Sequence, residues 1–293
     1  MIEPFTVPFM ARALAELALL ALICGPVSVF VFARRLSFVS DALTHTVFPG
    51  VVIGFLAGGL DGLFPGALVA GIVTAVALTL LTRGGALSDD ASTAVVLTAM
   101  FSIGVVLVSR RSSYTSDLTS FLFGRLLTVT PRQIAETAVL AVVILGLLLL
   151  GARALLFRTF DPAGAAAAGY RIAWLDLWLN VLVALVVVAA VRAVGTILVV
   201  ALLIVPAAAA RLVTTRLLPM ALLGGVLILL AGYGGLLISW TASVDHGIVL
   251  TSASTVVLLL VLAYLVLLPV GVLRRRRRRT GPIARRSPHE LVG

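Results

Sequence analysis

The sequence contains no lysine, so all 22 basic residues are arginines. A phosphate-binding loop of the G-x-x-x-x-G-K-[ST] type requires a lysine, which excludes an ATPase site of that kind in this chain. Cysteine occurs once, as Cys24, and this excludes both a disulfide framework and a cluster of cysteine ligands. No histidine pair with metal-ligand spacing and no nucleophile-and-base set is present, so we expect no enzymatic activity.

Charged residues are also scarce. They make up 12% of the 293 residues, against 61% hydrophobic residues and a mean hydropathy of +1.20. Soluble domains carry about 25% charged residues. Apolar runs long enough to cross a bilayer as helices recur along the chain, without the alternation typical of membrane strands. The sequence therefore predicts an all-α fold, a polytopic transmembrane helical bundle in a cell membrane.

The apolar runs define the candidate spans. We expect eight or nine, because residues 194–213 form either a full span or a half-helix. The segments are 12–33, 37–58, 62–82, 91–109, 132–157, 172–192, 194–213, 217–239 and 247–271. The segment 112–131 lies outside, dips into the membrane or reaches the other side.

Arginines gather at the ends of alternate spans, which predicts the orientation of the chain. With nine spans most of them share one side, and the positive-inside rule makes that side and the C-terminus cytoplasmic. Arg110, Arg111, Arg125 and Arg132 would then lie outside, against the rule. We expect a membrane domain at 1–273 and a disordered basic tail at 274–293, where eight arginines accompany one glutamate. The tail suits the anionic inner leaflet, and we expect no nucleic-acid binding because no aromatic residues are interleaved with the arginines.

Ionisable groups inside a membrane are candidates for function. Asp41 and His45 lie four residues apart and share one face of a predicted helix. A carboxylate and an imidazole suit Zn²⁺, Mn²⁺ or Fe²⁺. Pro49 has no N–H for the carbonyl of His45, so we expect a kink at this pair. The two side chains are either ligands along a metal path or a buried hydrogen-bonded pair that orders the bundle.

A second stretch, residues 158–171, predicts a short helix between two spans. Asp161 can cap a helix that begins at Pro162, and Gly169 is a natural C-terminal cap. This segment is either a helix that docks in a partner or an ordinary loop.

Two further features are weaker candidates. Pro206 lies in the apolar segment 194–213 and predicts another helix kink. Asp245 and His246 precede the last span, where they either meet an incoming cation at an outer mouth or form a solvated turn.

Several segments together resemble the metal-type ABC transporter permeases, which import zinc, manganese or iron. The resemblance covers about residues 10–270. The segments are RRLSFVSDALTHTVFPGV at 34–51, LTSFLFGRLL at 118–127, FDPAGAAAAGY at 160–170, VGTILVVALLIVPAAAARL at 194–212 and GIVL at 247–250.

The resemblance implies a homodimer of transport subunits with no ATPase site of their own. It implies a metal path lined by Asp41 and His45, and a cytoplasmic ATP-binding subunit that docks at the coupling loop 158–171 through Phe160, Asp161, Pro162 and Gly169. It also implies an extracytoplasmic solute-binding protein that delivers the ion.

On this basis the transported substrate is a divalent metal ion, for which we expect Zn²⁺ before Mn²⁺ or Fe²⁺, and no permanently bound cofactor. Two alternatives remain. One is an ABC permease for a metal chelate such as a siderophore or corrin. The other is an ion-coupled carrier or channel that works without ATP, for which more intramembrane carboxylates in two matching halves would be expected.

Overall fold

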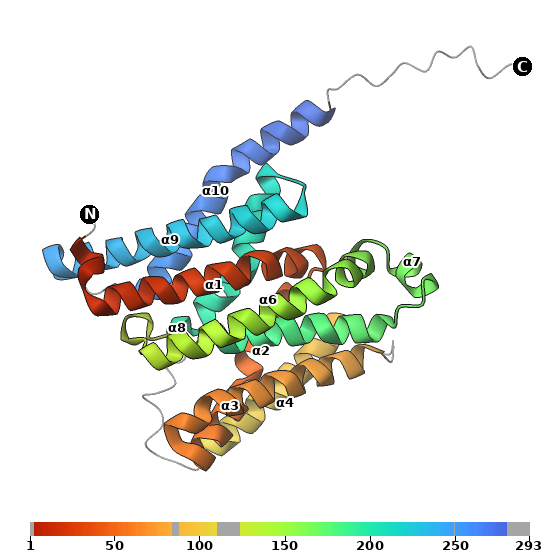
Figure 1. Ribbon diagram of the computed structural model, residues 1–293, viewed down its shortest axis with the longest axis horizontal. Coiled ribbons are helices and arrows are strands. Elements are labelled where there is room, and N and C mark those ends of the chain that lie inside the picture. The colour runs from red at the N-terminus through yellow and green to blue at the C-terminus, as the bar shows by residue number, and fades with distance from the viewer. Residues whose placement is uncertain (1–2, 84–87, 110–123, 249, 280–293) are drawn as a thin grey trace, which may run out of the picture.

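Helices make up almost all of the computed structural model, which describes residues 3–83, 88–109, 124–248 and 250–279 (Figure 1). That part of the chain contains no strand, which confirms the all-α prediction. The elements are η1 (Glu3–Thr6), α1 (Pro8–Ala33), α2 (Ser37–Thr46), α3 (Phe48–Arg83), α4 (Asp89–Ser109), η2 (Leu126–Thr128), α6 (Pro131–Phe160), α7 (Pro162–Ala167), α8 (Ile172–Val213), α9 (Leu217–His246) and α10 (Ser252–Arg279).

Seven helical segments of the described chain are long and apolar enough to cross a membrane. Two of them, Ser37–Arg83 with 47 residues and Ile172–Val213 with 42, exceed the roughly 20 residues that one crossing needs. Each is bent at glycine: α3 has non-helical backbone at Gly58 and Gly59, and α8 at Gly195. Counting each bent segment twice gives nine helical segments in the described chain, the upper of the two predicted numbers of spans.

The bend in α3 is closed by glycines from both of its halves. A methyl group at Gly50 would lie 2.2 Å from the carbonyl oxygen of Gly66, and one at Gly62 would lie 1.9 Å from that of Gly54. The two halves therefore touch backbone to backbone, as in other close helix pairs formed by small residues. Gly59, at φ 61°, adopts a left-handed conformation that glycine tolerates at the turn.

The backbone of α8 breaks at Gly195, with φ 78° and ψ 165°, beside the expected boundary between the spans 172–192 and 194–213. The backbone at Pro206 is helical, and a kink at this proline stays a prediction. Pro206 is buried and lies within helical backbone. It packs close to Gly224 of α9, because a methyl group at Gly224 would lie 3.5 Å from the Cβ of Pro206. The positive φ at Gly195 explains the sharper change of direction, since few other residues adopt it.

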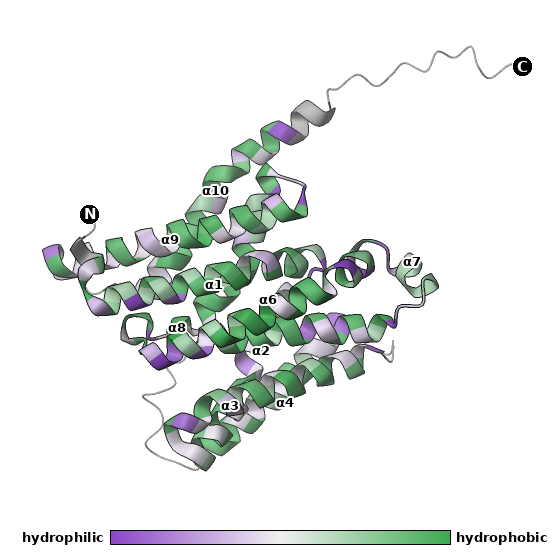
Figure 2. Cartoon of the chain, in the orientation of Figure 1, coloured by the Kyte–Doolittle hydropathy of each residue, from purple (hydrophilic) through white to green (hydrophobic). Residues whose placement is uncertain are grey.

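α8 forms the centre of the bundle. In the most apolar stretch of α8, 83% of the residues are buried, whereas in that of α10 the share is 17%. α8 contacts α1, α2, α3, α6, α9 and α10. Hydrophobic residues cover most of the helices, while polar residues concentrate near the helix ends (Figure 2). The peripheral helices therefore present apolar faces outward, as lipid contact requires.

The last helix reaches further than the sequence predicts. α10 continues through the arginine run to Arg279, whereas the expected span ends at residue 271. Arginine is a good helix former, and positive charge is favourable at a helix C-terminus. The rest of the predicted tail, 280–293, and most of the segment 112–131 lie outside the described residues.

Candidate functional site

Asp41 and His45 lie one turn apart on α2. His45 Nε2 is 3.9 Å from Asp41 Oδ1, and the two side chains are 33% and 45% exposed, in that order. This separation is longer than a hydrogen bond. The pair is therefore neither buried nor closed by a hydrogen bond, and both groups keep lone pairs for a ligand.

The surroundings of the pair come from α2 itself and from α4. The ring of Phe101 meets His45 edge-on, with centroids 6.2 Å apart. Thr44 is buried, and its hydroxyl donates to the Asp41 carbonyl at 2.7 Å. The proton of this hydroxyl is used within the helix, and the carboxylate and the imidazole are the ionisable groups that α2 offers to a ligand.

The helix breaks directly after the pair. α2 ends at Thr46 and α3 begins at Phe48, with Pro49 in its first turn. The His45 carbonyl accepts a bond from the Val47 N–H, so it is not bare as the sequence suggests. A carbonyl oxygen has two lone pairs, and one remains beside the imidazole.

The segment 158–171 forms the predicted short helix. Asp161 Oδ1 accepts from the Gly164 N–H at 2.8 Å and so caps α7, which begins at Pro162. Gly169 follows with φ 87°, a left-handed conformation that ends the helix. α7 projects from one end of the bundle, here called the α7 end (Figure 1), and the adjacent Phe160 is 64% exposed. The α7 end therefore presents an exposed aromatic ring beside a rigid turn.

An ion-pair cluster joins three helices next to α7. Asp176 of α8 pairs with Arg34 at 2.5 Å and with Arg158 at 3.2 Å, and all three side chains are at most 26% exposed. In the sequence, Asp176 lies near the start of the predicted span 172–192, where it could form a structural pair with a partner that the sequence does not identify. Its partners are 142 and 18 residues away, so the pairing becomes visible only in the fold.

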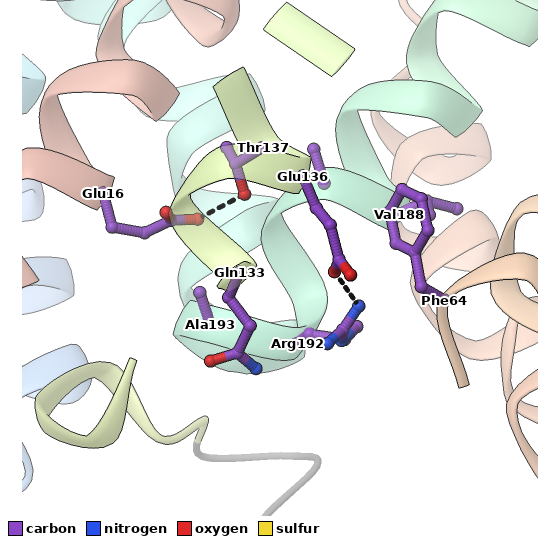
Figure 3. A pocket seen from close by; sticks show the side chains of 9 residues that line it. Glu16, Phe64, Gln133, Glu136, Thr137, Val188, Arg192 and Ala193 are labelled. Atoms are coloured by element: carbon purple, nitrogen blue, oxygen red, sulfur yellow. Dashed lines mark hydrogen bonds and ion pairs between the residues drawn. The ribbon is translucent and has the colours of Figure 1, made fainter. Parts of the chain in front are cut away.

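A second polar cluster gathers around the start of α6, the end of that helix that is far from α7, and Figure 3 shows its side chains. The Thr137 hydroxyl donates to Glu16 Oε1 at 2.8 Å, and Arg192 pairs with Glu136 at 2.8 Å and lies over the ring of Phe64. The recess between them has room for about one water molecule. Glu136 pairs with Arg132 and Arg192, whereas Glu16 has a partner at Oε1 and its buried Oε2 has none among the described residues. The positive charge of Arg192 disfavours a cation here, so this cluster suits helix packing.

The remaining candidates lie apart. Asp245 is exposed in the last turn of α9, and the His246 side chain lies outside the described part of the structure. Among the described residues no three His, Cys, Asp or Glu side chains are grouped closely enough to hold a metal ion. The Asp41–His45 pair is thus an incomplete ligand set within one chain.

The chain is similar over most of its length to known transport proteins. The model of the ABC 3 transport family matches residues 6–265. The manganese import system permease protein ScaB of Streptococcus parasanguinis is 34% identical over 84% of this chain and 87% of its own length. The manganese transport system membrane protein MntC of Halalkalibacterium halodurans is 34% identical over 65% of each chain.

Further similarities agree with these. The chelated iron transport system membrane protein YfeD of Yersinia pestis is 34% identical over 67% of this chain and 65% of its own. The solved structure of PsaBC from Streptococcus pneumoniae in complex with Fab superposes with a TM-score of 0.80 at 29% identity, covering 94% of this chain and 100% of the matched chain.

Proposed function

The chain belongs to the ABC 3 transport family, and from this premise we propose that it forms the membrane path of an ATP-driven importer of divalent metal ions. The observation that carries the proposal is the Asp41–His45 pair. It places an oxygen and a nitrogen ligand side by side on a helix of a membrane bundle, without a hydrogen bond between them. An ionisable pair in this position is costly in lipid and suits an ion pathway.

The pair supplies two ligands, fewer than a tight site needs. Incomplete coordination suits a path, because an ion that binds too tightly does not leave. The exposed fractions of both side chains would contact lipid if the chain stood alone. A second copy of the chain is the partner that we expect to cover them, with the ion passing between the copies.

ATP hydrolysis belongs to a separate subunit, since the chain has no lysine for a phosphate-binding loop. We propose that this subunit docks at α7 on the cytoplasmic side, where Phe160 is exposed beside the cap formed by Asp161. The C-terminus then lies on the same side. An extracytoplasmic solute-binding protein would deliver the ion at the opposite end, near Asp245.

The relatives named for manganese and iron favour these ions as the substrate over the zinc expected from the ligand types. All three ions accept one carboxylate and one imidazole. The ligands alone therefore do not rank them, and the experiment must measure all three.

The test is elemental analysis of manganese, iron and zinc in cells that lack this gene, grown with scarce metal. Rescue by the unmodified gene should restore one ion, whereas His45→Ala should not. Asp90→Asn is the matched control, because Asp90 is an exposed acidic residue in the first turn of α4, away from the pair. Unchanged levels of all three metals in the deletion strain would refute metal import. They would favour a permease for a metal chelate, or a carrier or channel that works without ATP.

A further inference from the structure

At the α7 end, a cavity of about 190 Å³ opens where the α8–α9 connection meets α10. Gly271 of α10 makes this approach possible, because a methyl group there would lie 2.7 Å from Leu212 Cδ2. Arg274 follows Gly271 by nearly one helical turn and reaches the carbonyl of Val213. The close contact of α10 with α8 therefore brings a guanidinium to the connection between α8 and α9.

The cavity lining is positively charged. Arg211 donates to the Thr215 carbonyl at 3.2 Å, and Arg274 donates to the Val213 carbonyl. A guanidinium has further N–H groups beyond the one used in each of these bonds. Within the described residues neither arginine forms an ion pair, and no acidic side chain lines the cavity. The hydroxyl groups of Thr214 and Thr215 add possible donors.

Next to the cavity, α10 offers an apolar surface. Val270 and Val266 precede Arg274 by four and eight residues, so they lie on the same face of the helix. They are 39% and 64% exposed. The cavity is positively charged, and an exposed apolar face of α10 lies beside it. This combination matches a molecule with an anionic head and hydrocarbon chains.

We infer that this cavity binds the phosphate headgroup of an anionic phospholipid, whose acyl chains lie along α10. Charge complementarity favours an anion, and the exposed apolar face formed by Val266 and Val270 favours a lipid over free phosphate. Arginine suits phosphate because its planar fork donates to two oxygens together. The inference does not depend on which ion the chain transports.

The test is native mass spectrometry of the purified full-length chain after delipidation, with phosphatidylglycerol or phosphatidylcholine added back. Wild type should retain phosphatidylglycerol preferentially. Arg211→Gln/Arg274→Gln should weaken its binding about thirtyfold, by the scale of surface arginines at anionic membranes. Arg153→Gln is the control, since Arg153 is exposed on α6 and does not line the cavity.

Three outcomes would overturn the inference: equal retention of the two lipids, unchanged binding by the double variant, or full displacement by inorganic phosphate at the same concentration as the lipid. The last would assign the cavity to free phosphate. If the double variant does not fold, Arg274→Gln alone leaves the bond between Arg211 and Thr215 in place and should still weaken phosphatidylglycerol binding at least threefold.

Discussion

Gly62→Ala tests the closed bend of α3, the segment that directly follows the Asp41–His45 helix. The new methyl carbon would lie 1.9 Å from the Gly54 carbonyl oxygen, whereas real contacts of this kind are essentially never under 3.0 Å. The two halves of α3 must therefore separate by more than 1 Å. Both contacting groups are backbone, so no side-chain rotation relieves the overlap.

Forcing extra methyl groups into packed interiors costs about 1–3 kcal/mol, and a backbone overlap of this size falls at the upper end. A loss of about 3 kcal/mol lowers the melting temperature of domains of 150–250 residues by roughly 6–12 °C. We expect a fall of that order in detergent. Metal uptake should also drop, because α3 carries on from the helix that holds the ligand pair.

The single cysteine provides the assay. Cys24 is fully buried in α1, so a thiol-reactive dye reports unfolding at one defined position. Gly146→Ala is the matched control: Gly146 lies within α6, and a methyl group there meets nothing within 4 Å. It should leave the melting temperature unchanged or raise it slightly, because alanine favours helix. A melting temperature for Gly62→Ala within about 2 °C of wild type would refute the packing argument.

Two further predictions concern the α7 end. Asp176→Ala leaves Arg34 without its carboxylate partner and should destabilise the chain by about 2–3 kcal/mol, somewhat less than for a fully buried pair. The same dye assay measures this loss, and an unchanged melting temperature would contradict a stabilising role of the ion-pair cluster. Asp161→Ala removes the cap on the Gly164 N–H, worth about 1 kcal/mol. Hydrogen exchange in α7 should therefore become faster, and copurification with the proposed ATP-binding subunit should fall. Unaltered exchange would argue against the cap.

Local chemistry made part of this structure predictable. The long apolar helices follow from the lengths of the apolar runs. The short helix α7 follows from an aspartate before a proline and a glycine at the end, because these signals act within a few residues. The side-by-side position of Asp41 and His45 follows from helical spacing in the same way.

Other features depend on contacts between distant segments. The sequence shows Gly50 and Gly54 as a stripe of small residues, but not that Gly66 and Gly62 face them across the bend. The cluster around Asp176 likewise joins three separate helices. In α8 the break lies at Gly195, whose left-handed φ the apolar pattern of the sequence does not reveal.

The most direct test of the proposed metal path is ATP-dependent uptake of manganese, iron and zinc by proteoliposomes that contain the chain with its ATP-binding subunit. We expect His45→Ala and Asp41→Asn each to reduce uptake of one ion at least tenfold, while the ATP-binding subunit still copurifies and Asp90→Asn transports normally. Wild-type uptake by both path variants would contradict the assignment of the Asp41–His45 pair as the route of the ion.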